Sequence, residues 1–293
     1  MTDLGTTSRP ADPAQGARRR SAAYRAARAA WQAAGRRTAP IRVLPSFLIV
    51  GGQRCGTTSL FTALSQHPGV RMPLGRKGIH YFDVAYHHDL SWYRGHFPLA
   101  VPGSRVITGE SSPYYMFHPL APERIARDLP SVRLIAALRD PVERAYSAHA
   151  HELARGFETE PFERALELEA SRLAGTGALL SAAGQPEVPA HRHQAYLTRG
   201  QYIDQLERLE ALVGRDRIHV VDSAVFFETP EREFSEVLAY LGLPAADTIR
   251  FGQHNARPRA PMPGSLRGRL EEHFRPYDER LARWLGRPPS WRT

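Results

Sequence analysis

The alternation of apolar runs, loops and helix-prone stretches predicts an α/β fold of three layers, with a central parallel sheet flanked by helices. Two apolar runs, at 41–50 and 132–138, each lead into a short loop and then into a stretch with helical spacing. A helix after each strand carries the chain back to a parallel neighbour, so both faces of the sheet become covered. Ligands of such folds bind near the carboxyl ends of the strands.

Composition divides the chain at residue 40. Residues 1–40 carry much of the formal net charge of +9 and few large apolar side chains, so we expect a basic, flexible N-terminal extension with a helix-prone Arg/Ala stretch. Residues 41–293 contain neither an internal repeat nor a convincing linker, and we expect one folded domain. Net positive charge alone fits nucleic acid, an anionic membrane or an anionic nucleotide equally well.

Cysteine usage and apolar run length indicate the compartment. Cys55 is the only cysteine, which excludes an intramolecular disulfide and a Cys-rich zinc site. The first forty residues hold no apolar run of signal-peptide length, and no later run approaches the roughly 20 residues of a membrane-spanning helix. We therefore expect a soluble, cytoplasmic protein.

The other elements follow from the same patterns. Further short strands are expected at 105–109 and 218–221, and helices at 58–66, 119–128, 142–154, 162–173 and 202–212. Small residues predict a flexible loop at 175–189. The remainder is expected to be mainly helical.

The loop 51–59 lies between the first strand and its helix, where consecutive backbone N–H groups and the helix dipole form a cradle for an anion. Both glycines of the triphosphatase pattern G-x-x-x-x-G-K-[ST] are present and Thr58 fills the hydroxyl position, but Thr57 stands where the lysine belongs. The nearest cation is Arg54. The pattern predicts a P-loop-like fold whose ligand carries fewer charges than a triphosphate, which disfavours a kinase or ATPase.

A second anion site is predicted where the strand 132–138 ends. Arg139 follows this strand and Ser147 lies two turns into the next helix, so both can face one phosphate. Taken singly, Arg139 could instead pair with Asp140 or Glu143, and the serine hydroxyl could bond to its own helix. Together with the first loop, the two positions fit one ligand with two separate anionic groups.

Three segments, 47–59, 109–114 and 138–147, resemble the sulfotransferase family, particularly its bacterial branch similar to heparan sulfate sulfotransferases. The similarity includes Arg199-Gly200-Gln201-Tyr202 and runs from about residue 45 to the end, which would make 41–293 the sulfotransferase domain. The resemblance implies 3′-phosphoadenosine 5′-phosphosulfate (PAPS) as donor and no requirement for a metal. It also implies in-line transfer of a sulfuryl group to an acceptor hydroxyl or amine.

The resemblance also implies which residues hold the donor. The 5′-phosphosulfate would be bound by Gln53, Arg54, Cys55, Gly56, Thr57, Thr58 and Ser59. Arg139 and Ser147 would bind the 3′-phosphate. A basic loop that closes over the nucleotide in the family corresponds to 255–259, with Arg257 as the expected contact and Arg259 as a weaker one.

The acceptor side needs a base for the acceptor proton and cations for the leaving group. We expect Arg54 to stabilise the leaving group and Lys77 to add charge stabilisation. In the family a glutamate commonly acts as base at the position that Gly78 occupies here. His80 is therefore favoured as base, since histidine accepts protons near neutral pH, and Glu110 is the competing candidate.

Three functions remain open at this point. The first is a sulfotransferase acting on a small-molecule, carbohydrate or lipid acceptor, with no nucleic-acid partner. The second is a P-loop small-molecule kinase, which would need magnesium and ATP. The third is a non-catalytic nucleotide or nucleic-acid binding module that uses the basic extension.

Overall fold

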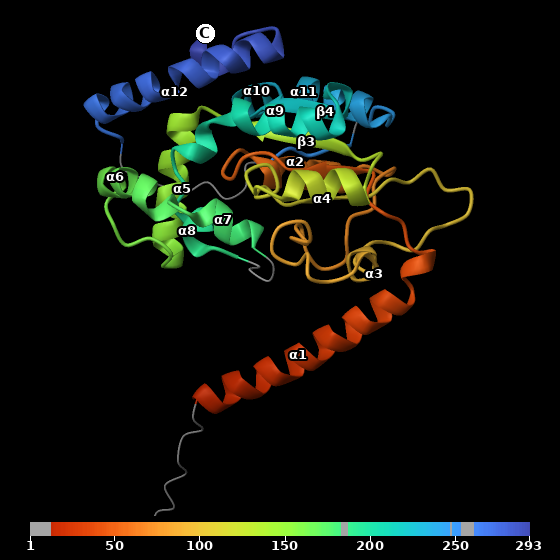
Figure 1. Ribbon diagram of the computed structural model, residues 1–293. Helices are drawn as coiled ribbons and strands as arrows, with labels where there is room; N and C mark the ends of the chain where they lie inside the picture. The colour runs from red at the N-terminus through yellow and green to blue at the C-terminus, as the bar shows by residue number, and fades with distance from the viewer. Residues whose placement is uncertain (1–12, 183–186, 247, 253–260) are drawn as a thin grey trace, which may run out of the picture.

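The central element is a four-stranded sheet in which every pairing is parallel (Figure 1). The computed structural model describes residues 13–182, 187–246, 248–252 and 261–293. The strands are β1 (Phe47–Ile49), β2 (Gly109–Ser111), β3 (Arg133–Leu138) and β4 (Ile218–Asp222), in the order β2-β1-β3-β4. The α/β class with a central parallel sheet, predicted from the alternation of apolar runs and helices, is confirmed.

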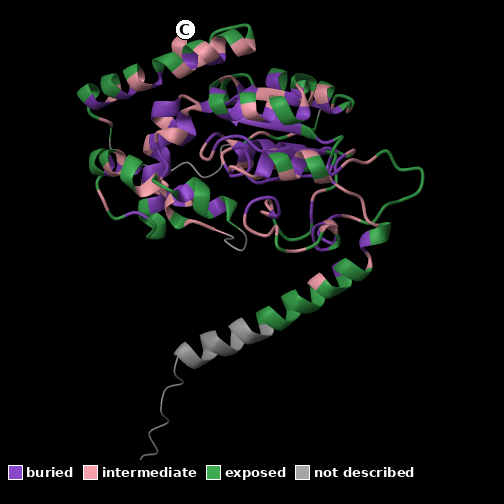
Figure 2. Cartoon of the chain, viewed as in Figure 1, coloured by how far each residue is buried: buried purple, intermediate pink, exposed green. Residues whose placement is uncertain are grey.

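The strands β1 and β3 are buried because their side chains are apolar on both faces. All three residues of β1 and the last five of β3 are buried, as the purple strands in Figure 2 show. Phe47 of β1 pairs with Gly109 on one side and Arg133 on the other. A Cβ at Gly109 would lie 2.5 Å from the Phe47 ring, so this position in β2 admits only glycine.

Helices flank the sheet, with α12 above α9 in the view of Figure 1. Their bounds are α2 (Thr57–Ser65), α3 (Leu90–Arg94), α4 (Ala121–Asp128), α5 (Pro141–Arg155), α6 (Phe162–Leu173), α7 (Thr176–Ser181), α8 (Pro189–His193), α9 (Tyr202–Val213), α10 (Ser223–Glu228), α11 (Pro230–Leu241) and α12 (Gly264–Leu285). In the described part of the chain, no helix combines the length and the apolar character that crossing a membrane requires.

Three predicted boundaries were wrong. The first strand, expected over the apolar run 41–50, spans only Phe47–Ile49, and a short 3-10 helix occupies Ala39–Ile41. The strand expected at 105–109 begins only at Gly109, because the backbone before it serves other partners: Ile107 forms an isolated bridge with Val70, and the Thr108 carbonyl accepts from the Ser46 amide at 2.8 Å. The loop expected at 175–189 contains the helix α7, which Leu180 anchors with its buried side chain. Residues 183–186 of that loop lie outside the described residues.

In the described part of the N-terminal extension, the helix α1 (Pro13–Arg37) projects from the body of the molecule in Figure 1. Its last turns pack on α3, where a Cβ at Gly35 would lie 2.8 Å from the Gly95 carbonyl oxygen. The Trp31 ring also meets the His96 ring edge-on at 4.9 Å between centroids. The extension is therefore attached to the domain by packing as well as by the chain.

Candidate functional site

The loop between β1 and α2 turns sharply through two residues with left-handed backbone, Arg54 (φ 71°) and Gly56 (φ 76°). It also presses against the neighbouring strand, since a Cβ at Gly51 would lie 2.1 Å from the Ala137 amide nitrogen. Gly56 then caps α2 without a side chain of its own. The predicted anion cradle thus stands at the carboxyl end of β1, ahead of a helix N-terminus.

Lys77 supplies the cation that is missing from position 57. Its Nζ donates hydrogen bonds to Thr57 Oγ1 at 3.0 Å and to Thr58 Oγ1 at 2.9 Å. Burial lowers the pKa of Lys77 to about 7, because the charged ammonium loses solvation beside the loop. Sequence reasoning named Lys77 for charge stabilisation but did not foresee this contact, since no pattern links residues 20 positions apart.

The second predicted anion site meets the first. Arg54 Nε donates to Ser147 Oγ at 3.1 Å, so the α5 serine faces the glycine-rich loop. Arg139 lies at the end of β3 and forms the ion pair with Glu143 that sequence reasoning had weighed, at 3.6 Å. Tyr202 joins the two loops, because its hydroxyl donates to the Arg139 carbonyl at 2.9 Å and lies 3.6 Å from Cys55 Sγ.

Gln53 is held from two sides by buried groups. Its Nε2 donates to Glu152 Oε1 at 2.7 Å, and its Oε1 accepts from Arg199 Nη1 at 2.7 Å. The Arg199 atoms Nε and Nη2 are buried and have no acceptor in the part of the chain that the structure describes. Burial lowers the pKa of Arg199 to about 10. Arg199 was noted only within a family-like segment, and its burial and its contact with Gln53 depend on tertiary packing that no local pattern contains.

His80 forms a close pair with Asp83. Its Nδ1 lies 2.7 Å from Asp83 Oδ2, and its backbone amide donates to Ser112 Oγ at 3.2 Å. Burial acts to raise the pKa of Asp83, but His80 and the Val84 amide outweigh it and the pKa is lowered. The imidazole is 31% exposed whereas the Asp83 side chain is 0% exposed, so only the histidine can meet a ligand.

Glu110 is enclosed. Its carboxylate accepts from the Ile79 amide at 2.6 Å, from Ser112 Oγ at 2.7 Å, and from the hydroxyls of Tyr115 and Tyr93 at 2.7 and 3.0 Å. Burial raises its pKa, against the effect of these donors. Of the two candidate bases, His80 is therefore partly exposed and Glu110 is fully buried.

Gly78 has no room for a side chain. A Cβ there would lie 2.7 Å from the Ser111 carbonyl oxygen and 3.0 Å from Ser112 Oγ. The glutamate expected from the family pattern therefore could not be accommodated at this position in the present backbone.

The remaining predicted site residues divide into two groups. Cys55 is buried in the loop and Ser59 in the first turn of α2. Burial raises the pKa of the Cys55 thiol, which fits a packing residue. Arg257 and Arg259 lie outside the described residues. Where the chain is described, no three His, Cys, Asp or Glu side chains come together as a metal site would require.

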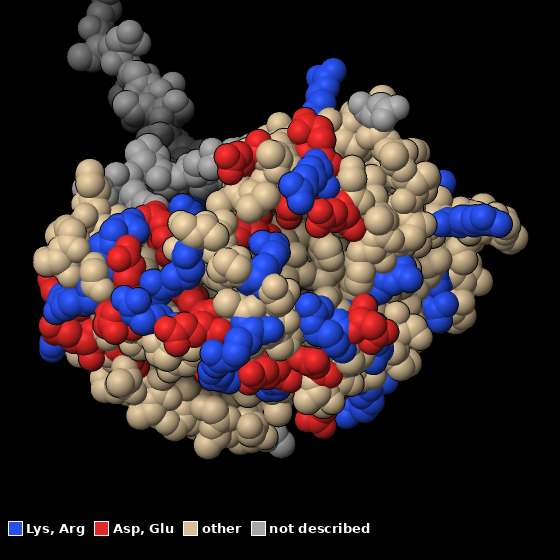
Figure 3. All heavy atoms as spheres, turned by 90° about the horizontal axis from the view of Figure 1, so that it is seen from above, with Lys and Arg blue, Asp and Glu red and all other residues tan. Residues whose placement is uncertain are grey.

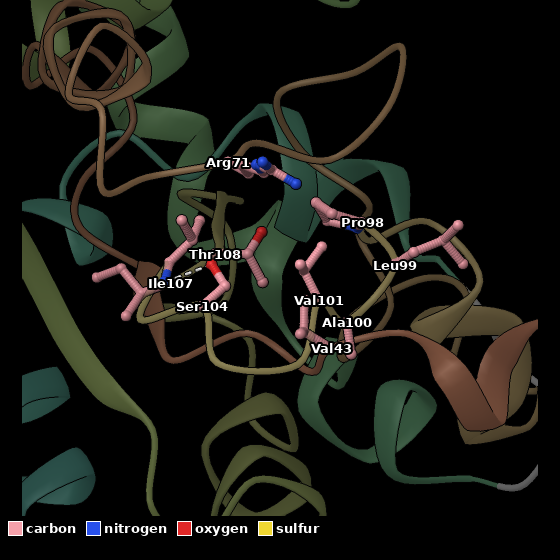
Figure 4. A pocket seen from close by; sticks show the side chains of 10 residues that line it. Val43, Arg71, Pro98, Leu99, Ala100, Val101, Ser104, Ile107 and Thr108 are labelled. Atoms are coloured by element: carbon pink, nitrogen blue, oxygen red, sulfur yellow. Dashed lines mark hydrogen bonds between the residues drawn. The ribbon is translucent and has the colours of Figure 1, made fainter.

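A cavity of about 130 Å³ lined by Val43, Arg71, Pro98 and Thr108 lies elsewhere (Figure 4). Val43 and Thr108 precede β1 and β2, so this cavity is at the amino ends of the strands, whereas Gln53 and Arg139 follow their carboxyl ends. Ligands of open parallel sheets bind at the carboxyl ends. We therefore do not assign the cavity to the site.

The face that carries α12 shows basic and acidic side chains interspersed (Figure 3). Pairs on it include Arg267 with Glu143, Arg275 with Glu272, and Arg280 with Asp204. A nucleic-acid surface requires a field of one sign, and this face does not provide one.

Fold and site together define an α/β protein with a glycine-rich loop at the carboxyl end of β1 and a His80–Asp83 pair on the segment whose Lys77 contacts that loop. A family model described as "Sulfotransferase domain" matches residues 44–255. The chain belongs to the sulfotransferase family, and the resemblance inferred from its motifs is confirmed. It is accordingly a transferase of sulfuryl groups, and the kinase alternative is not favoured.

Individual relatives support the assignment to the sulfotransferase family. The chain is 28% identical over 274 residues to human "Heparan sulfate glucosamine 3-O-sulfotransferase 6", covering 85% of this chain and 74% of that protein. It is 26% identical over 280 residues to the mouse "Bifunctional heparan sulfate N-deacetylase/N-sulfotransferase 4", covering 85% of this chain but only 31% of that protein. A sulfotransferase structure from Alicyclobacillus acidocaldarius matches with a TM-score of 0.70 and 28% identity, covering 86% of this chain and all of the other.

Proposed function

We propose that this chain transfers the sulfuryl group of PAPS to a hydroxyl or amine of an acceptor. The hydrogen bond of 3.1 Å between Arg54 and Ser147 carries the proposal. It joins the glycine-rich loop to the second anion site, and a donor with phosphates at both the 5′ and 3′ positions of one adenosine needs two such sites side by side. Gly51 lets the loop pack against Ala137, and Gly56 provides the left-handed turn ahead of α2. Consecutive backbone N–H groups of such a loop would receive the phosphosulfate.

The donor contacts divide by end. Thr57, Thr58 and Lys77 would hold the 5′-phosphosulfate, and Arg139 and Ser147 would hold the 3′-phosphate. As the acceptor forms its bond to sulfur, the bond between sulfur and the bridging oxygen breaks, and negative charge collects on the departing phosphate. Arg54 and Lys77 would stabilise that charge, since preorganised cations act most strongly where charge develops.

His80 would take the acceptor proton. With Nδ1 held by the Asp83 carboxylate, Nε2 is the nitrogen that can face an acceptor. Glu110 would instead act as a positioning residue. Its carboxylate accepts from the Ile79 amide, next to His80, and from Ser112 Oγ, which in turn accepts from the His80 amide. Position 78 holds glycine where the family pattern has a glutamate base, so His80 would accept the acceptor proton instead.

The acceptor class follows from the relatives. Two of them are named for heparan sulfate, which supports a carbohydrate acceptor, with lipids and small molecules as the further classes to screen. The lone cysteine supports work in a reducing, cytoplasmic compartment.

A calorimetric titration tests the donor assignment. We expect adenosine 3′,5′-bisphosphate to bind without divalent metal and more tightly than ATP with magnesium. In a separate transfer assay, the labelled sulfuryl group of PAPS should appear on an acceptor from a carbohydrate panel. Tighter binding of magnesium-ATP, or transfer of its terminal phosphate, would establish a kinase instead.

A further inference from the structure

A cavity of about 390 Å³ adjoins the acceptor side of the candidate site. Gly78, Ile79 and His80 line it, and so do Arg28 and Gln32 of the N-terminal helix α1. Lys77, the residue before Gly78, contacts the donor loop. The short segment 77–80 therefore touches the donor loop at one end and this cavity at the other.

The position of α1 beside the cavity is built into the packing. Gly35 and Gly95 approach so closely that a Cβ on either would lie within 2.8 Å of the other's backbone. Arg36 pairs with Asp89 at 3.8 Å, in addition to the contact between Trp31 and His96. These contacts fix the last turns of α1 on α3, and Arg28 lies two turns earlier on the same helix.

The cavity wall is cationic and partly aromatic. Arg28 and Arg76 contribute guanidinium groups, and none of the described residues that line the cavity is acidic. His87 and His88 lie with their ring centroids 4.1 Å apart, and His88 stacks on Trp92 at 4.3 Å. Arginines bind carboxylates and sulfates through paired N–H groups.

We propose that α1 forms part of the acceptor site, and that Arg28 and Arg76 bind a carboxylate or sulfate already present on the acceptor while His80 meets its accepting group. This inference rests on the proposed sulfuryl transfer and extends it to the N-terminal helix. The family match begins only at residue 44, so α1 lies outside the shared domain and would make acceptor selection a property of this chain.

Two matched probes test the proposal: para-nitrophenyl β-D-glucuronide and para-nitrophenyl β-D-glucoside differ only in the carboxylate. Their dissociation constants are measured by ligand-observed NMR with adenosine 3′,5′-bisphosphate present. We expect the glucuronide to bind about fivefold more tightly, the size of a solvent-accessible ion pair. Arg28→Ala and Arg76→Ala should each reduce this preference, and Arg37→Ala, on the same helix but away from the cavity, should keep it.

The variant Gly35→Val tests the position of α1 separately from the charge of its arginines. Its side chain would meet the Gly95 backbone and displace α1 without removing an arginine, so the preference should fall as in Arg28→Ala while the bisphosphate still binds. Equal affinity for both probes, absence of binding by either at the highest soluble concentration, or a preference that survives Arg28→Ala would each overturn the proposal. Loss of bisphosphate binding by the unmodified chain would instead reject the proposed function.

Discussion

Arg54 Nε donates a hydrogen bond to Ser147 Oγ at 3.1 Å, although the two residues are 93 positions apart. The arginine belongs to the loop after β1 and the serine to the helix after β3, and these strands are neighbours in the sheet. Parallel neighbours bring their carboxyl ends to one edge of the sheet, so the two segments predicted to bind anions lie side by side. This contact is the basis of the first prediction.

Removing the Arg139 side chain should weaken binding of adenosine 3′,5′-bisphosphate by about tenfold to a hundredfold, the size of a charge-assisted hydrogen bond. Adenosine 5′-phosphosulfate lacks the 3′-phosphate and is the matched ligand, and its affinity should not change in Arg139→Ala. Titration calorimetry measures both. An equal loss for the two ligands would contradict the assignment of Arg139 to the 3′-phosphate.

Donor binding should take up a proton through Lys77. Burial holds the pKa of Lys77 at about 7 in the free protein, and a bound phosphate or phosphosulfate would raise it. Above pH 7 the free lysine is mostly neutral and the bound one charged, so donor affinity should fall as pH rises further. Calorimetry at pH 8 in buffers of different ionisation enthalpy counts the protons. Lys77→Arg, which stays charged, should show no uptake, and unchanged uptake in that variant would exclude Lys77 as the source.

His80→Ala should lower kcat by about a hundredfold or more, as expected for loss of a general base. Bisphosphate affinity should remain close to that of the unmodified chain, whereas thermal stability should fall, because alanine leaves the buried Asp83 carboxylate without the imidazole. Asp83→Asn should shift the pH dependence of kcat without abolishing activity, since Asp83 acts through His80. Full activity in His80→Ala would show that another group accepts the acceptor proton.

Glu110→Gln should primarily destabilise the protein. The enclosed carboxylate accepts from four donors, and an amide would turn a donor of its own toward some of them, at a cost of about 1–3 kcal/mol. Thermal and denaturant unfolding measure this. A variant of normal stability with greatly reduced kcat would instead support a direct catalytic role for Glu110.

Gly78→Glu should not supply a base. The added Cβ would lie 2.7 Å from the Ser111 carbonyl oxygen, and such overpacking costs about 1–3 kcal/mol. Gly268→Glu is the control, since a side chain at that position in α12 meets open space. Recovery of activity when Gly78→Glu is combined with His80→Ala would show that the backbone adjusts and the position remains available.

Short-range patterns were sufficient for the parallel sheet and for the loop 51–59, because strand burial, glycine turns and helix starts depend on neighbouring residues. The same patterns placed Arg139 and Ser147 after β3, and the order of the strands then let Ser147 face the first loop. The boundary of β2 failed because pairing with β1, which no local pattern contains, decides where that strand begins.

Tertiary packing alone decided which side chains contact the glycine-rich loop and which candidate base is exposed. Lys77 replaces the lysine missing from position 57 only because the chain returns to the loop 20 residues later. Glu110 and His80 were comparable candidates as sequence, but burial closed one and left the other accessible. The contact of α1 with the cavity depends on a glycine crossing between residues 60 positions apart. Solvent exposure and such long-range contacts are properties of the folded surface, so periodicity and spacing carry no record of them.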